Sequence, residues 1–370
     1  MPTCPGNIRE LKSAFGMKPQ TNYSTANIQA DLWNLLRTNT AALQTEEGTE
    51  TDAMDIGKGD EFPTTVFKTT MSTSLEFQKY TTSEFMAWLF YFALGAGTKT
   101  AAGTGWTYAC TPQDPVVACI NLPSFTYVEQ IRTGVNAIVD RAAVGMVVND
   151  FQLNLTSGPG RANCQVTSHW IGTGQIIQPS GLTIPAPTSE HLLNSSNAAT
   201  ITVNGIDYLA GTRAGCFTSL QFGWNNNVRL DTGYYPGSGS YQGFATRGRM
   251  EFGTRAITLS FVARAVAGSQ EYTNLLALTE GATTITINGA VIGAGPQTHG
   301  MTISLPRTII SAAVIGDQDG IVTINCTVTV LTPVAGPPLC TLSATTATTG
   351  IGGLFIPGQE EEPPPLGKAA

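Results

Sequence analysis

The alternation of apolar and polar residues predicts short strands along most of the chain, interrupted by two helices. The clearer helix begins near Thr81 and Glu84, which have the spacing of a capping box, and ends at Gly95. Its apolar face, at the i, i+3, i+4, i+7 spacing of one helix side, consists of Phe85, Trp88, Leu89 and Phe92. Because that face is largely aromatic, we expect the helix to pack on a sheet.

Residues 150–156 and 163–171 alternate cleanly, with Phe151, Leu153 and Leu155 on one side of the first segment. The residues between them, 157–160, read Ser-Gly-Pro-Gly, a sequence typical of a tight turn. We therefore expect these two segments to form a β-hairpin.

The second half of the chain repeats this order in outline. Strands are predicted at 217–225 and 256–263, before a second helix. Ser269 is expected to cap this helix and Gly281 to end it. Its apolar residues on one side are Tyr272, Leu275 and Leu276. Further strands follow at 283–288, 301–305, 308–314 and 321–331, with an Asp-Gly turn before the last. The similar order of elements indicates an internal duplication.

The segments outside these two units have a different character. Residues 25–43 show a weak helical pattern. Residues 46–61 carry only one base, Lys58, and predict an exposed loop or a two-stranded arm with seven acids, Glu46, Glu47, Glu50, Asp52, Asp55, Asp60 and Glu61. From 333 onward the chain is rich in Pro, Gly and Thr and lacks the apolar surface to fold alone.

The predicted fold class is mainly β, with two tandem β-sandwich or half-barrel units that each have one short flanking helix, and an extended C-terminal segment. The expected division is an N-terminal segment and acidic arm at 1–62, a first unit at 63–180, a linker at 181–205, a second unit at 206–333 and a C-terminal segment at 334–370.

Composition changes this picture in one respect. Of the 370 residues, 42% are hydrophobic but only 12% are charged, about half the usual share of roughly 25%. A surface this poor in charge is expected where copies of a protein cover one another. The net charge of −7 argues against a protein that grips nucleic-acid phosphates, which would present a basic face.

Several kinds of site and segment are not expected. The N-terminus has no apolar core of a signal peptide, and the longest apolar run, 85–97, is shorter than the roughly 20 residues of a membrane span. The seven cysteines include no Cys-x-x-Cys and are expected to be reduced, although pairing after assembly stays open. His169, His191 and His299 have no partner at ligand spacing, so neither a metal nor a cofactor is expected, and His169 is expected to be packed or at an interface.

Two charged groups remain as candidates for assembly. One is the acidic segment 46–61, and the other is a set of arginines, Arg229, Arg247, Arg249 and Arg255. They are either two solvated loops or complementary surfaces, with the acidic arm of one subunit docking on the arginine face of another.

The chain resembles the tail tube (major tail) proteins of long, non-contractile-tailed bacteriophages of the siphovirus type. The resemblance is in the order of three groups of residues, which together cover more than half of the chain. The first group is the acidic arm, which runs into Ile-Gly-Lys-Gly-Asp-Glu-Phe-Pro at 56–63, with the helix at 84–94. The second is the hairpin at 150–170, which closes with Ile-Gly-Thr-Gly. The third is 217–227, which contains Trp-Asn-Asn-Asn, followed by 243–261.

The resemblance implies a virion structural protein without catalysis or cofactor. Such proteins join edge to edge into rings with a continuous β-barrel wall, and the rings stack into a tube through which DNA leaves the capsid. It implies self-association, as trimeric pseudo-hexameric or as hexameric rings, and contact with tape measure, tail terminator and baseplate or tip proteins. DNA would cross the lumen without specific binding, no membrane would be involved, and assembly in the host cytoplasm would place the protein in the virion tail.

Two other readings stay open at this stage. A capsid or tail surface adhesin or decoration protein of tandem immunoglobulin-like sandwiches would share the strand content but lack a strong helix inside a domain. A secreted carbohydrate hydrolase would need paired carboxylates in a cleft, and neither half shows an obvious pair.

Overall fold

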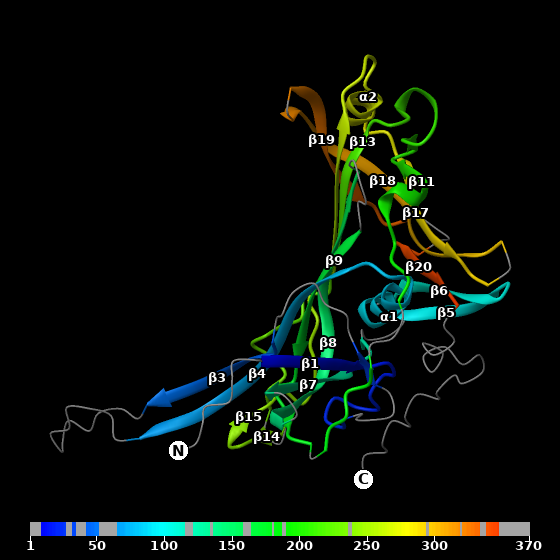
Figure 1. Ribbon diagram of the computed structural model, residues 1–370. Coiled ribbons are helices and arrows are strands. Elements are labelled where there is room, and N and C mark those ends of the chain that lie inside the picture. Colours follow the sequence, from blue (N-terminus) through cyan, green and yellow to red (C-terminus); the bar gives the residue numbers. More distant parts are fainter. Residues whose placement is uncertain are drawn as a thin grey trace, which may run out of the picture.

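A computed structural model gives the fold of the chain, which is mainly β and elongated, with two α-helices in the part described (Figure 1). The structure describes residues 9–26, 32–34, 42–51, 65–114, 121–133, 136–157, 164–179, 181–186, 190–235, 239–293, 296–318, 320–333 and 338–347. The prediction of a mainly β fold is confirmed.

The first of two similar groups of strands is built from the first half of the chain. Its order is β3–β4–β9–β8, and all neighbours are antiparallel. The strands are β3 (Gln44–Thr51), β4 (Val66–Tyr80), β8 (Asn136–Thr156) and β9 (Gln165–Gly172). The pairing of β8 with β9 confirms the predicted hairpin, and Phe151, Leu153 and Leu155 are all buried.

The second group has the order β13–β16–β19–β18, again antiparallel throughout. Its strands are β13 (Phe217–Asn225), β16 (Ala256–Arg264), β18 (Thr298–Gln318) and β19 (Ile321–Val330). The two groups are joined edge to edge, because β13 pairs antiparallel with β8, where Trp224 faces Phe151. Eight strands thus form one continuous open sheet.

The registers of the two groups correspond. Leu75 and Phe77 of β4 face β9 as Leu259 and Phe261 of β16 face β19, and all four side chains are buried. The β8–β9 ladder shifts register between Val148 and Asp150, and the β18–β19 ladder shifts at the corresponding place, between Ile310 and Ala312. These shared positions agree with the predicted repeat, which stays a prediction.

The long strands β8 and β18 each change pairing partners along their length. The first part of β8 pairs with β7 and β10, and β7 continues to β1 and β2. These strands are β1 (Arg9–Gly16), β2 (Leu32–Asn34), β7 (Phe125–Thr133) and β10 (Ile176–Ile177). The strand at Leu32–Asn34 corrects the weak helix expected at 25–43, most of whose other residues lie outside the described part.

The first part of β18 pairs with β17 on one side and β20 on the other. The sheet continues from β17 to β11 and β12, and from β20 to β6 and β5. These strands are β5 (Gly95–Ala102), β6 (Gly105–Pro112), β11 (Ala198–Val203), β12 (Ile206–Asp207), β17 (Gly281–Val291) and β20 (Thr341–Thr346).

Strand β20 corrects one expectation about the C-terminal segment. Part of that segment lies inside a sheet, with Leu342 and Ala344 buried, because strands from the rest of the chain supply the surface that it lacks alone. The segments 301–305 and 308–314, expected as two strands, belong to the single strand β18. Smaller elements are β14 (Ser240–Tyr241), β15 (Phe244–Ala245) and the 3-10 turns at Ser195–Asn197 and Gly211–Arg213.

Helix α1 (Ser83–Leu94) lies where the sequence predicts it and forms the centre of the core. Its predicted apolar face is fully buried, and the ring of Trp88 lies 4.4 Å from the rings of Phe15 and Phe92. Gly95 ends the helix in the left-handed conformation at φ 85°, which favours glycine. The capping box is wrong: Thr82, not Thr81, caps the helix, and its hydroxyl accepts from the backbone N–H of Phe85.

Helix α2 (Gln270–Ala277) also lies where expected, after Ser269, but it presents a different face. It buries Glu271 and Asn274, whereas Tyr272 and Leu276 are exposed. Its C-cap is Leu278, so Gly281 does not end it. Polar anchoring of this helix is possible because Glu271 contacts Arg213 and accepts a hydrogen bond from the hydroxyl of Tyr208 at 2.9 Å.

Two further findings concern the cysteines and the helices. The five cysteines in the described part are free and buried, namely Cys110, Cys164, Cys216, Cys326 and Cys340, while Cys4 and Cys119 lie outside it. No helix among the described residues has the length and apolar character needed to cross a bilayer.

Candidate functional site

The acidic segment begins as a two-stranded arm. Strands β3 and β4 pair from Gln44–Ser74 to Thr51–Val66 and project from the body of the molecule (Figure 1). Glu46, Glu47 and Glu50 are exposed on β3. Asp52, Asp55, Asp60 and Glu61 lie outside the described residues. Of the two alternatives left open by the sequence, the described part therefore corresponds to the arm.

The arm also carries apolar side chains that the sequence analysis did not single out. Val66 and Phe67, on the outer part of β4, are 62% and 53% exposed. An exposed pair of this kind on a projecting hairpin is costly in water and is typical of a contact surface. The alternation of apolar and polar residues over 66–80 could have revealed this exposed pair, because two adjacent apolar residues, Val66 and Phe67, interrupt the polar face there.

The four arginines do not form one surface. Arg247 is buried, its guanidinium donating to the carbonyl of Gly172 at 2.9 Å and contacting the carbonyl of Leu230. Arg255 donates to the carbonyl of Gln113. Burial lowers the pKa of both groups. Only Arg229 and Arg249 are exposed, and Arg249 pairs with Glu251 at 2.7 Å.

Within the described residues, the acidic arm and the arginine set interact through Glu46 and Arg247. The carboxylate of Glu46 acts on the charge of Arg247 and opposes the lowering of its pKa by burial. Beside it, Lys68 of the arm donates to the carbonyl of Gln242 at 2.9 Å and lies over the ring of Phe244. The arm therefore contacts the segment that contains Gln242 and Phe244, close in sequence to Arg247.

The two ends of the eight-stranded sheet are open in the described part. At one end, β4 beyond Ser74 pairs only with β9, and β3 pairs only with β4. At the other end, the outer half of β18 pairs only with β19. Val314 and Ile315 on this outer half are 61% and 70% exposed. Unpaired strand edges are liabilities in an isolated protein.

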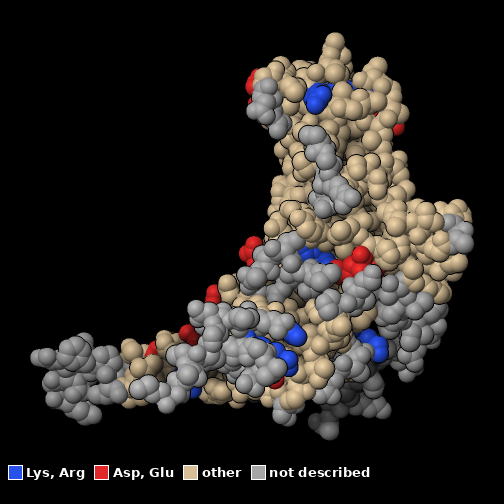
Figure 2. Space-filling model, viewed as in Figure 1, with Lys and Arg blue, Asp and Glu red and all other residues tan. Residues whose placement is uncertain are grey.

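Further exposed apolar side chains cluster near the same end. Tyr272, Leu276 and Leu278 of α2 and its cap are 49%, 70% and 63% exposed, and Ile321 and Val322 at the start of β19 are 43% and 50% exposed. Figure 2 shows that this end of the molecule carries few charged side chains. An apolar, weakly charged end is consistent with a covered surface in an assembly.

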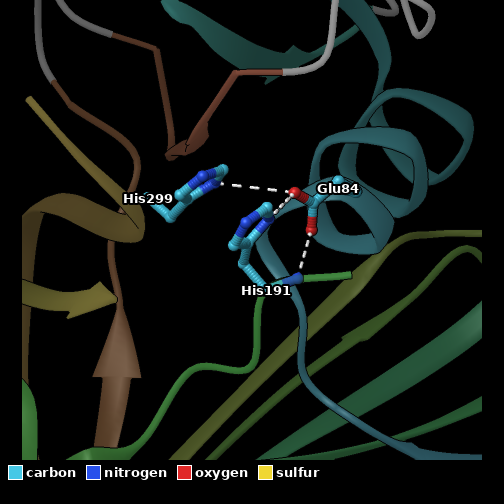
Figure 3. Close-up of side chains that lie close together, drawn as sticks. All are labelled: Glu84, His191 and His299. Carbon is cyan, nitrogen blue, oxygen red and sulfur yellow. Dashed lines mark hydrogen bonds and ion pairs between the residues drawn. The ribbon is translucent and has the colours of Figure 1, made fainter. Parts of the chain in front are cut away.

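A separate cluster joins three residues that are far apart in sequence: Glu84, His191 and His299 (Figure 3). Helix α1 contributes Glu84, the segment before Ser195–Asn197 contributes His191, and β18 contributes His299. Glu84 and His299 are 2% exposed and His191 is 39% exposed. One carboxylate and two imidazoles therefore share a site that opens to solvent at one side.

The carboxylate of Glu84 organises the cluster. Its Oε1 atom lies 2.7 Å from Nδ1 of His191 and 3.5 Å from Nδ1 of His299, and its Oε2 atom accepts from the backbone N–H of His191 at 3.0 Å. The hydroxyl of Thr346 donates to Oε1 at 3.0 Å. Although burial opposes the shift, these hydrogen bonds hold the pKa of Glu84 below its usual value.

The two imidazole rings stack face to face, with centroids 3.6 Å apart and planes 15° from parallel. Burial and the neighbouring His191 lower the pKa of His299. Its Nδ1 atom also lies 3.0 Å from the hydroxyl of Ser83.

The sequence analysis found no partner at ligand spacing for any histidine, and the fold brings two of them, His191 and His299, together with Glu84. The sequence contains no local spacing that could reveal the cluster, because strand pairing and helix packing bring its members together. His169 is not part of it; its Nδ1 lies 3.4 Å from Asp150, and its ring is about one-third exposed.

Comparison with known proteins agrees with the architecture. No curated protein matches the chain. A family model described as phage tail tube protein matches residues 11–330, which includes both repeated units and the helix-containing core. The chain therefore belongs to the phage tail tube protein family and is a structural component of the phage tail.

Proposed function

We propose that the chain assembles with copies of itself into rings, and that stacked rings form the tube through which DNA leaves the virion. The observation that carries the proposal is the joint between β8 and β13. It unites two copies of one unit edge to edge, and it leaves the opposite edges, β3–β4 and the outer half of β18, open in the described part. A second chain can extend the sheet at each end.

The repeat indicates which residues the neighbour would cover. Leu153 of β8 is fully buried and faces Phe222 of β13. Ile315 takes the equivalent place on β18, since it faces Ile324 as Leu153 faces Val166, yet Ile315 is 70% exposed. The two equivalent positions differ in their neighbours: β8 has β13 beside it, whereas no described strand other than β19 pairs with the outer half of β18. A neighbouring chain at this edge would bury Ile315.

Charge favours the same function. Like charges repel, so a conduit wall with a net negative chain charge of −7 suppresses binding of DNA phosphates in transit. The arm, with its acids and its exposed Val66 and Phe67, would reach a neighbouring subunit, where Arg229 and Arg249 are the exposed members of the arginine set. In this role the chain needs neither catalysis nor a cofactor.

Because each chain carries two units, three chains would supply six units per ring; a hexamer of two-unit chains is the alternative. Assembly would take place in the host cytoplasm and end in the virion tail of a siphovirus. Contacts with tape measure, tail terminator and baseplate or tip proteins would complete the tail.

Negative-stain microscopy of the purified protein tests the proposal. We expect stacked rings from the unmodified chain and folded single chains from Val314→Lys/Ile315→Lys, which places charge on the open edge of β18. Val291→Lys is the matched control, because Val291 is equally exposed, at 59%, but lies on β17 away from the two open edges. Single particles from the unmodified chain at high concentration, or normal tubes from the β18 variant, would contradict the proposal.

A further inference from the structure

We propose that Glu84, His191 and His299 bind one divalent transition metal ion of the zinc type, a role independent of ring formation. Imidazole nitrogen and carboxylate oxygen are ligands that Zn²⁺ and its neighbours in the first transition row prefer. The ligand atoms of the three residues lie within 4.8 Å of one another. Glu84 and His299 are almost completely buried. A Glu side chain is almost never fully buried unless it is paired.

The arrangement of the two imidazoles is the main reason for the inference. Both Nδ1 atoms face the same carboxylate oxygen, Oε1 of Glu84, at 2.7 and 3.5 Å (Figure 3). Ligand atoms around a tetrahedral ion with bonds near 2.0–2.1 Å are roughly 3.3 Å apart. The two distances are on either side of this value, so only small shifts would be needed in these two spacings.

One rearrangement is required. Two parallel rings 3.6 Å apart direct their nitrogen lone pairs along parallel lines and not toward one point. A bound ion would therefore turn at least one ring. His191 has the room to turn, because it is 39% exposed, and that exposure also provides a path by which an ion can enter.

The surroundings would hold the ligands in place. The Thr346 hydroxyl and the backbone N–H of His191 fix the carboxylate of Glu84, as outer hydrogen bonds commonly do for metal ligands. The Ser83 hydroxyl, 3.0 Å from Nδ1 of His299, or a water at the open side would complete the coordination. The nearby ammonium of Lys79 is paired with Glu190, so its charge is compensated.

An ion at this position would connect four segments: the start of α1, the segment at His191, strand β18 and, through Thr346, strand β20. It would therefore act as a cross-link inside the subunit. Because a metal bound to the folded chain stabilises it by mass action, the unfolding temperature should rise with metal concentration.

The test uses the full chain after treatment with a chelator. Titration with Co²⁺ should give one equivalent of bound ion with the visible absorption of nitrogen and oxygen coordination, and Zn²⁺ should displace it and raise the unfolding temperature. His191→Ala should weaken Co²⁺ binding at least tenfold. Glu84→Gln, which keeps the shape of the side chain, should do the same. His169→Ala, which changes the one histidine outside the cluster, should bind Co²⁺ as the unmodified chain does.

Two outcomes would overturn the inference. The first is no stoichiometric binding by the unmodified chain, which would make the cluster a hydrogen-bonded part of the core only. The second is equal binding by the unmodified chain and by His191→Ala, which would place the ion elsewhere. Circular dichroism of each metal-free variant separates loss of binding from loss of folding, and none of these measurements depends on whether tubes form.

Discussion

Val148 and Ile310 occupy the same place in the two repeats, each immediately before a register shift in the ladder of a long strand. Val148 faces Trp170 and Ile310 faces Val328, and both are fully buried. β-Bulges of this kind bend a strand and raise its twist, and related sequences tend to keep them. The bulges lie where the strands change partners: β8 passes from β7 to β9 and β18 passes from β17 to β19 close to these positions.

The burial of Trp88 predicts a large loss of stability on truncation. Trp88→Ala removes a fully buried side chain in contact with several aromatic rings and leaves the carbonyl of Gly16 without its indole donor. We expect a loss of about 3–5 kcal/mol in the free energy of unfolding, measured by denaturant titration. Trp88→Phe should lose less; equal losses for the two variants would contradict a packing role.

The projecting arm predicts that a chain without it still folds but no longer assembles. Deletion of residues 46–61 removes no core residue among those of this range that the structure describes, 46–51, and should leave circular dichroism and the unfolding temperature nearly unchanged. The deleted chain should fail to polymerise when imaged by negative stain. Glu46→Gln/Glu47→Gln/Glu50→Gln keeps the strand but not its charge, so normal tubes from this variant would assign the role of the arm to shape and not to charge. Normal tubes from the deletion itself would refute the role.

The two open edges predict that two variants, each altered at a different edge, can still pair with each other. The Val314→Lys/Ile315→Lys chain keeps its β3–β4 end, and the arm deletion keeps its β18 end. Mixed together, they can form only one kind of joint, so light scattering during size-exclusion chromatography should show dimers that contain one of each. Rings in the mixture, or dimers of either variant alone, would show that the joints are elsewhere.

The buried pair of Arg213 and Glu271 predicts that the stability of the fold around α2 depends strongly on the positive charge of Arg213. Both side chains are at most 5% exposed, and Glu271 also accepts from the hydroxyl of Tyr208. Arg213→Met leaves a buried carboxylate without its cation and should cost about 3–5 kcal/mol, as measured by denaturant titration. The double variant Arg213→Met/Glu271→Gln should recover part of this loss, and no recovery would indicate that packing of Arg213, and not its charge, is decisive.

His169 predicts a pH dependence of known sign. The hydrogen bond from its ring to Asp150 raises its pKa in the folded state, against the opposing effect of burial. The folded chain therefore holds the proton more tightly than the unfolded chain. The resulting stabilisation is complete below the unfolded histidine pKa of about 6.5 and disappears as pH rises through the higher folded value.

Denaturant midpoints measured on the two sides of that window check the prediction. The difference between the unmodified chain and Asp150→Asn should be larger on the acid side than on the alkaline side, where the hydrogen bond from Asn149 to Asp150 still contributes. The effect should be small, because the ring is about one-third exposed. A difference that is the same at both pH values would contradict it.

Local patterns predicted the elements of this fold well where the pattern had a direct physical cause. The aromatic face of α1, the left-handed Gly95 that ends it, and the β8–β9 hairpin all follow from spacing and turn chemistry within a few residues. The same reasoning placed Tyr272, Leu275 and Leu276 on one side of α2 but did not determine whether that side is buried. There the apolar side chains Tyr272 and Leu276 point outward, because the helix is anchored by polar groups from distant segments.

The amino-acid sequence alone determined the β-rich class, the order of elements that repeats along the chain, and the low charge of a surface made to be covered. The tertiary structure decided which edges stay open, that Arg247 and Arg255 make contacts within the chain, and that Glu84, His191 and His299 meet. The physical reason is the distance along the sequence over which each kind of interaction acts. Periodicity and turn chemistry act between near neighbours, whereas strand pairing and helix packing join residues more than a hundred positions apart.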